Sequence, residues 1–190
     1  MRKIIVSEFV TLDGVMEDPG GAERTPNGGW SFKFGRSDDQ NKFKSDELTA
    51  CDALLLGRVT YQGFAAAWPT MPGAGAYGER MNSLPKYVVS TKPQTLAWNN
   101  SRLITGNVPE ELSRLKQQPG QDILVFGSGN LIQTLMAHDL VDQYNLLVHP
   151  IVLGGGHRLF QDGRQAMLKL VDTQRFETGI LALIFQADKK

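Results

Sequence analysis

Short apolar runs alternate along this chain with segments in which apolar residues recur every three or four positions. The runs predict strands near residues 2–10, 52–57, 86–91, 102–105, 122–126, 142–152, 167–176 and 179–187. The segments of helical spacing predict helices near 37–50, 58–66, 75–83, 109–117 and 129–137. This alternation is typical of an α/β domain whose central sheet is mostly parallel and flanked by helices.

The C-terminal end departs from the alternation. Its last two predicted strands are separated only by a short segment around Thr178 and Gly179, which leaves no room for a crossover helix. Because so short a connection joins antiparallel strands, we expect a C-terminal antiparallel hairpin and a mixed sheet. With 190 residues, 41% of them hydrophobic, the chain can bury a sizeable core, and we expect residues 1–190 to form a single domain.

Three short polar segments each follow an apolar run that reads as a buried strand. They are Gly57–Tyr61 after 53–56, Ser90–Lys92 after 87–89, and Gly127–Asn130 after 123–126. The carboxyl ends of parallel strands meet at one edge of an open sheet, and ligands bind there. Small residues let a phosphate approach the backbone, helix N-termini offer free N–H groups, and Arg58 and Lys92 supply positive charge. Together the segments predict a site for a phosphorylated dinucleotide.

These three segments, in this order, resemble the NADPH-binding segments of the dihydrofolate reductase superfamily, above all its branch that includes the reductase domain of riboflavin biosynthesis. The opening residues 7–14, Ser-Glu-Phe-Val-Thr-Leu-Asp-Gly, are similar to the first strand and turn of that branch. Residues 150–156, followed by Leu159 and Phe160, resemble its late strand and loop. The resemblance runs from about Arg2 to the C-terminus. It implies a dihydrofolate reductase-like fold and an NADPH-dependent oxidoreductase.

The resemblance also implies which residues bind the cofactor. They are Thr11, Gly14, Gly57, Arg58, Thr60, Ser90, Thr91, Lys92, Gly127, Ser128, Gly129, Asn130 and Leu131. Taken singly these signals are weak, since Ser90–Lys92 could be an ordinary turn and Gly-x-Gly occurs in many strand-to-helix turns. The conjunction of the three is what predicts NADPH. Arg58 and Lys92 form the obvious anion site, and we expect it to hold the 2′-phosphate that distinguishes NADPH from NADH.

The catalytic residues are harder to identify. In true dihydrofolate reductases a buried carboxylate on the first helix assists protonation, and the matching region contains Asp38 and Asp39. An acidic helix start would explain both residues equally well, since carboxylates are favourable at that end. Asp13 is the other candidate because, by resemblance, its turn lies beside the nicotinamide; an Asx turn before Gly14 is the competing explanation. We therefore expect Asp13, Asp38 or Asp39 to shape the substrate side of the pocket.

Three functions remain open. The first is reduction of a small heterocyclic or carbonyl/imine substrate. The second is a riboflavin-pathway reductase of the 5-amino-6-(5-phosphoribosylamino)uracil type, whose phosphorylated substrate would need a further cation from among Arg24, Lys33, Arg36 and Arg158. The third is an NADP(H)-binding module without catalysis, which the missing helix carboxylate favours. The resemblance and the apolar strand 144–148 both predict a homodimer.

Composition narrows the partners. Twenty basic and twenty acidic side chains cancel without a basic stripe, which argues against nucleic acid and membrane surfaces. No apolar stretch approaches the roughly 20 residues of a membrane span, so we expect a cytoplasmic protein. The three histidines have no partners at metal-ligand spacing, and Cys51 is interpreted as a buried inert thiol. The segment Pro19–Gly35 carries three aromatic residues, which are often found in a ligand lid or an oligomer contact.

Overall fold

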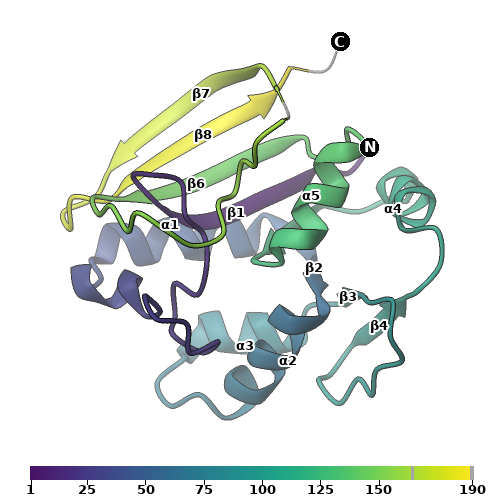
Figure 1. Cartoon of the computed structure of the whole chain (residues 1–190). Coiled ribbons are helices and arrows are strands. Elements are labelled where there is room, and N and C mark those ends of the chain that lie inside the picture. Colours follow the sequence, from purple (N-terminus) through teal and green to yellow (C-terminus); the bar gives the residue numbers. More distant parts are fainter. Residues whose placement is uncertain (164, 189–190) are drawn as a thin grey trace.

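The computed structural model describes residues 1–163 and 165–188, whose strands form one eight-stranded sheet in the order β4-β3-β2-β5-β1-β6-β8-β7 (Figure 1). The first six strands in this order, β4 through β6, all pair with their neighbours in parallel, whereas β8 pairs antiparallel with both β6 and β7. The strands are β1 (Ile4–Thr11), β2 (Cys51–Gly57), β3 (Lys86–Val89), β4 (Ser101–Ile104), β5 (Asp122–Phe126), β6 (Gln143–His149), β7 (Leu168–Arg175) and β8 (Leu181–Ala187). The predicted α/β class, mostly parallel sheet and C-terminal hairpin are confirmed.

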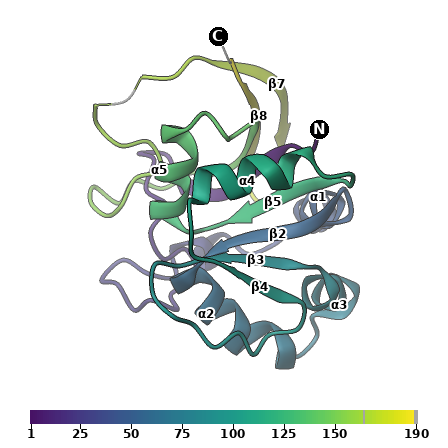
Figure 2. The same cartoon turned by 90° about the vertical axis from the view of Figure 1, so that its right-hand side faces the viewer.

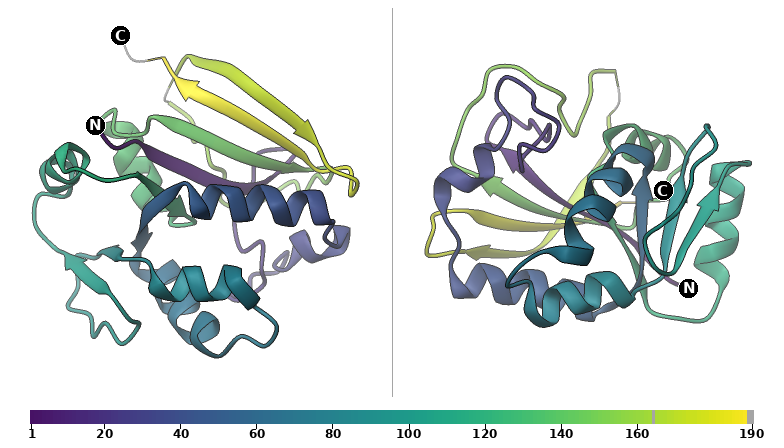
Figure 3. Two further views of the ribbon diagram at one scale, coloured as in Figure 1. Left: turned by 180° about the vertical axis from the view of Figure 1, so that it is seen from behind. Right: turned by 90° about the horizontal axis from the view of Figure 1, so that it is seen from below.

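Helices cover both faces of the sheet. On one face α4 (Val108–Gln117) and α5 (Gly129–Ala137) pack against alternate residues of β1, β2, β5 and β6 (Figure 2). On the other face lie α1 (Asp38–Thr49), α2 (Arg58–Ala67) and α3 (Gly75–Ser83), seen from behind in Figure 3. Two 3₁₀ helices, η1 (Trp30–Phe34) and η2 (Trp68–Thr70), complete the elements. No helix in the described part of the chain is long and apolar enough to cross a membrane.

The bounds agree with the sequence to within a few residues, and two strands end earlier than predicted. The strand predicted to reach 152 ends at His149, because Pro150 has no N–H to donate to the sheet. The strand predicted to reach 91 ends at Val89. There Ser90 Oγ accepts a hydrogen bond from the Lys92 N–H (3.0 Å) and bends the backbone into a turn.

The aromatic segment Pro19–Gly35 is folded against the carboxyl end of β6. Trp30 is fully buried, and its Nε1–H donates a hydrogen bond to the Glu17 carbonyl oxygen (2.8 Å). The Trp30 ring packs edge-on against the His149 ring, with 5.0 Å between the ring centres. The buried Asp18 carboxylate accepts backbone N–H bonds from Glu23 and Thr25, both at 3.0 Å. Trp30 is therefore a core residue, while Phe32, which is 63% exposed, lies at the surface.

Candidate functional site

The three polar turns open at one edge of the sheet. The first turn, Gly57–Tyr61, follows β2; the second, Ser90–Lys92, follows β3; and the third, Gly127–Asn130, follows β5. These three strands are neighbours in the sheet and run parallel. Helix α2, which follows β2, and helix α5, which follows β5, lie on opposite faces of the sheet. Helix α1, which follows β1, also lies on the face opposite to α5. The β2/β5 and β5/β1 gaps are thus topological switch points, where open α/β sheets bind ligands.

The first and third turns touch each other. Ser128 Oγ accepts a hydrogen bond from the Gly57 N–H (2.6 Å) and donates one to Thr60 Oγ1 (3.0 Å). A Cβ atom at Gly57 would lie 2.9 Å from Ser128 Cβ, and one at Gly127 would lie 2.9 Å from Thr60 Oγ1. Gly127 also has a positive φ of 55°. Both glycines are therefore needed for the close approach of the two turns.

The helices that begin at these turns have free N-termini. The N-cap residue of α2 is Gly57, which has no side chain to offer, and the N-cap Ser128 of α5 makes no side-chain cap bond. Ser128 instead takes the left-handed conformation, with φ 72°. The backbone N–H groups of both first turns are left to bind an anion, as a phosphate-binding helix start requires.

The second turn carries exposed cationic and hydroxyl groups. Ser90 is buried and its hydroxyl is used within the turn, whereas Thr91 and Lys92 are exposed. On the neighbouring turn, Arg58 donates to Gln62 Oε1 (3.2 Å), and Gln62 in turn donates to Gln94 (3.0 Å) beyond Lys92. Neither Arg58 nor Lys92 forms an ion pair with a carboxylate of the described residues. Their charges are available to a ligand.

Asp13 is bound into its own turn. Its carboxylate accepts hydrogen bonds from Thr11 Oγ1 (2.6 Å) and from the backbone N–H groups of Leu153 (3.2 Å) and Gly154 (2.9 Å). The Thr11 hydroxyl and the two N–H groups lower the pKa of Asp13 to about 2. The carboxylate is therefore ionised at neutral pH and ties the end of β1 to residues 153–154. This geometry favours the turn-forming explanation over a proton donor.

Asp38 and Asp39 lie at the first turn of α1. The Asp39 carboxylate accepts from the Ser37 hydroxyl and from the N–H groups of Gln40 (2.8 Å) and Glu177 (3.2 Å), which hold its pKa below the ordinary value. Asp38 is exposed. The Asp39 contacts are those of an acidic helix start, and Asp38 occupies the same first turn. The side chain that α1 buries at this position is Gln40, which accepts from Thr178 Oγ1 at 3.4 Å.

Sequence reasoning missed a buried acid, Glu8, in the middle of β1. Its side chain is buried, and Oε1 has no hydrogen-bond partner among residues 1–163 and 165–188. Burial raises the pKa of Glu8 to about 8, opposed by the Lys44 ammonium and a backbone hydrogen bond from Gly127. The signal was present in the sequence: Glu8 is the one charged residue in the strand Ile4–Thr11.

A polar network lies between β1 and α1 on the other face. The Lys44 ammonium contacts Ser7 Oγ (2.6 Å) and Glu47 Oε2 (2.5 Å), and Asn145 donates to Glu47 Oε1 (2.6 Å). Lys44 also lies 4.7 Å from the centre of the Phe126 ring. The network holds a cation beneath the carboxyl end of β5, where it lowers the pKa of Glu8.

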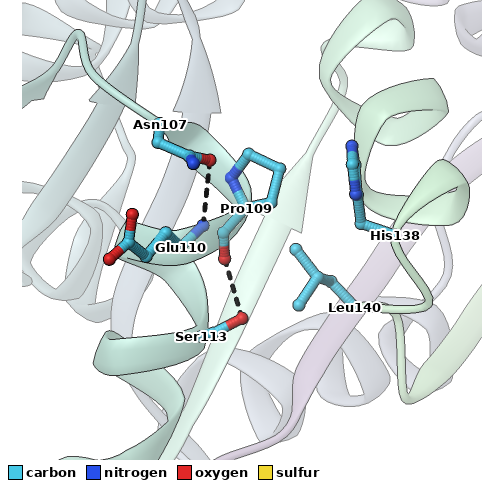
Figure 4. Close-up of a pocket in the computed structure, with 6 residues that line it drawn as sticks. All are labelled: Asn107, Pro109, Glu110, Ser113, His138 and Leu140. Atoms are coloured by element: carbon cyan, nitrogen blue, oxygen red, sulfur yellow. Dashed lines mark hydrogen bonds between the residues drawn. The ribbon is translucent and has the colours of Figure 1, made fainter.

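Two surface hollows lie away from the three turns. One of about 470 Å³ lies between the start of α4 and the end of α5, lined by Asn107, Pro109, Glu110, Ser113, His138 and Leu140 (Figure 4). The other, of about 320 Å³, lies at the amino ends of the strands and includes Cys51 and Glu47. Burial raises the pKa of the Cys51 thiol to about 11, as expected of an inert cysteine. Neither hollow contains a residue of the predicted site.

Sheet order, helix placement and turn positions together define a dihydrofolate reductase-like domain. The chain matches the family described as the RibD C-terminal domain over residues 2–182, and it belongs to that family. Membership implies an oxidoreductase of the riboflavin-type reductase class.

Relatives of nearly the same length exist in Bacillus subtilis (strain 168). The uncharacterized protein YyaP is 32% identical over 188 residues, which are 97% of this chain and 94% of that protein. The uncharacterized protein YwjB is 27% identical over 180 residues, which are 94% of this chain and 95% of that protein.

Two solved structures share the fold. A candidate riboflavin biosynthesis protein from Shewanella sp. PV-4 superposes with a TM-score of 0.77 at 19% identity, covering 98% of this chain and 99% of that one. A pyrimidine reductase-like protein from Corynebacterium diphtheriae NCTC gives a TM-score of 0.69 at 11% identity, covering 100% and 93%. At these identities the likeness concerns the fold alone.

Proposed function

We propose that this protein is an NADPH-dependent reductase that transfers a hydride to a small heterocyclic or carbonyl/imine substrate. One observation carries the proposal: two uncapped helix N-termini and the unpaired cations Arg58 and Lys92 gather at the switch-point edge within the described chain. A dinucleotide with three phosphates matches that combination, because the free N–H groups suit a pyrophosphate and the cations suit an additional phosphate.

Different residues bind different parts of the cofactor. The free N–H groups in the first turns of α2 and α5 hold the pyrophosphate, and Gly57 and Gly127 let these two helix starts lie close together, since a Cβ atom at either glycine would meet the other turn. Arg58 and Lys92 bind the 2′-phosphate. The remaining predicted cofactor residues are Thr11, Gly14, Thr60, Ser90, Thr91, Gly129, Asn130 and Leu131. When bound, NADPH supplies the hydride, and the chain orients it over the carboxyl ends of β5 and β1.

A reductase of the 5-amino-6-(5-phosphoribosylamino)uracil type is the second candidate. Its substrate phosphate needs a cation near the end of β1, and Arg158 lies there. Arg158 is exposed and donates from Nε to the Asp13 carbonyl oxygen (3.0 Å). A non-catalytic NADP(H)-binding module is the third, because the Asp39 carboxylate is engaged in the helix start and Asp38 is exposed. Measuring NADPH oxidation across aminopyrimidine, pterin, imine and carbonyl substrates separates these candidates.

We further propose that residues 1–190 act as one domain and form a cytoplasmic homodimer. The edge strand β7 exposes Leu170 (50%) and Val171 (42%), and Met167 beside it is 65% exposed. An apolar edge strand is a liability in a monomer, since it can pair with other chains. Light scattering at micromolar protein should therefore give twice the chain mass; a monomer mass would contradict the dimer.

A further inference from the structure

Glu8 lies where β1 loses its neighbour on the β5 side. The parallel pairing of β1 with β5 ends at Ser7 and Phe126, and from Gly127 onward the chain turns away toward α5. On its other side Glu8 still pairs with Leu146 of β6. Glu8 is thus the first residue of β1 that borders the switch-point gap, beside the backbone of Gly127.

On its own face of the sheet, Glu8 lies among apolar residues. By strand alternation it shares a face with Val6 and Val10, and its partner Leu146 is also a core residue. The charged groups that act on it are Lys44 and Glu47, both from α1. A buried carboxyl oxygen without a hydrogen-bond partner is unfavourable, so this side chain destabilises the protein when no ligand is bound. A ligand in the gap could provide the missing partner.

We propose that Glu8 is a catalytic residue of the reductase: its carboxyl group contacts the nicotinamide end of the bound cofactor and delivers the proton that completes reduction. This inference rests on the proposed NADPH function. It differs from the sequence prediction, in which Asp13, Asp38 or Asp39 took this place. Those carboxylates accept hydrogen bonds that favour the ionised form of Asp13 and Asp39, whereas the environment of Glu8 favours the protonated form.

The hydride adds to the substrate carbon of a C=N or C=O bond, and the electron pair of that bond moves to the nitrogen or oxygen. The O–H bond of Glu8 breaks, and a new N–H or O–H bond forms on that heteroatom. The electron pair left on Glu8 makes a carboxylate, which the Lys44 ammonium and the Gly127 N–H stabilise. Water then returns a proton to Glu8. A general acid of this kind accelerates a reaction by about 10²–10⁴-fold.

The test compares binding of NADPH and NADP⁺ by calorimetry at pH 6.5 and 9.5. The oxidised nicotinamide ring is positively charged and the reduced ring is neutral. An ionised Glu8 beside the ring should therefore favour NADP⁺ selectively, and the ratio of the two dissociation constants should move toward NADP⁺ by about tenfold on raising the pH. Titration of the shared 2′-phosphate, or of Lys86, affects both cofactors alike and cancels from the ratio.

The variants are Glu8→Gln, which keeps the shape and the neutral charge, and Asp122→Asn at the opposite end of β5 as a matched control. Glu8→Gln should bind NADPH within about twofold of wild type at pH 6.5, abolish the pH-dependent change of the ratio, and lower turnover by about 10²-fold or more. Asp122→Asn should keep the change. Infrared difference spectra of the wild-type complexes give a second readout, since the protonated carboxyl band at pH 7 should weaken with NADP⁺.

The outcomes separate the two proposals. If neither cofactor binds at millimolar concentration, the NADPH function itself is wrong. If both bind but the wild-type ratio is independent of pH, or the change survives in Glu8→Gln, the role of Glu8 is overturned while the cofactor site stands. Should Glu8→Gln not fold, the wild-type ratio and the infrared band still decide, and a flat ratio or an unchanged band overturns the proposal.

Discussion

Replacing Arg58 by alanine tests the proposed 2′-phosphate site. In the free protein the Arg58 guanidinium is partly exposed, and its hydrogen bond goes to Gln62 at 3.2 Å. A charge-assisted hydrogen bond contributes roughly 1.5–3 kcal/mol, and partial exposure lowers that value through solvent screening. We therefore expect Arg58→Ala to weaken NADPH binding by about tenfold, which corresponds to about 1.4 kcal/mol. NADH, which lacks the 2′-phosphate, should bind almost unchanged.

The assay is titration of both cofactors by nicotinamide fluorescence at two salt concentrations. Raising the salt from 0.1 to 1 M shortens the screening length from about 10 to about 3 Å, so it should narrow the NADPH preference of the wild type. Arg114→Ala is the control, because Arg114 lies on α4 and pairs with Glu110 at the surface. Equal weakening of NADPH and NADH would mean that Arg58 contacts the shared pyrophosphate or supports the fold, and the assignment would be refuted.

Gly127→Ala should weaken NADPH binding by about tenfold or more in the same titration, because the new Cβ would meet Thr60 and move the starts of α2 and α5 apart; normal affinity would contradict the need for their close approach. Asp13→Asn should lower the melting temperature more than the turnover per folded molecule, since the carboxylate holds Leu153 and Gly154; the reverse would restore Asp13 as catalytic. Because burial raises the pKa of Glu8 from 4.5 to about 8, the folded state resists ionisation of this side chain and the free energy of unfolding falls as the pH rises from about 4.5 to about 8, so wild type should lose urea resistance over that interval relative to Glu8→Gln. Lys86→Met should cost roughly 3 kcal/mol or more in urea unfolding, with exposed Lys3→Met as the control, because the buried Lys86 ammonium donates to three carbonyls that would lose their partner.

Much of the fold could be predicted because it depends on local pattern. The apolar runs of β2 and β5 are buried on both faces, so they stand out as strands, and the short connection at Gly179 allows only a hairpin. The common edge of the three turns follows from parallel pairing. The early end of β6 at His149 could also have been predicted from Pro150.

The substrate side depended on burial, which sequence does not reveal. Asp13 and Asp39 looked chemically suitable, but the structure surrounds both with N–H and hydroxyl donors that keep them ionised. Glu8 was not predicted as a site residue, because in the sequence it is one of the residues 7–14 that resemble the first strand and turn of the family. Its isolation among apolar residues becomes meaningful only once the end of the β1–β5 ladder places it at the gap. Likewise, the sequence predicts a ligand lid or an oligomer contact for the segment that carries Trp30, whereas the Trp30 side chain is buried against His149 of β6.

Direct titration of NADPH into the protein tests the central claim. With Arg58, Lys92 and the free starts of α2 and α5 at one edge, we predict saturable one-to-one binding, tighter for NADPH than for NADH. Binding should weaken as salt increases, because charged groups hold the extra phosphate. An absence of binding at millimolar NADPH would contradict the account, and equal affinity for the two cofactors would contradict the 2′-phosphate site.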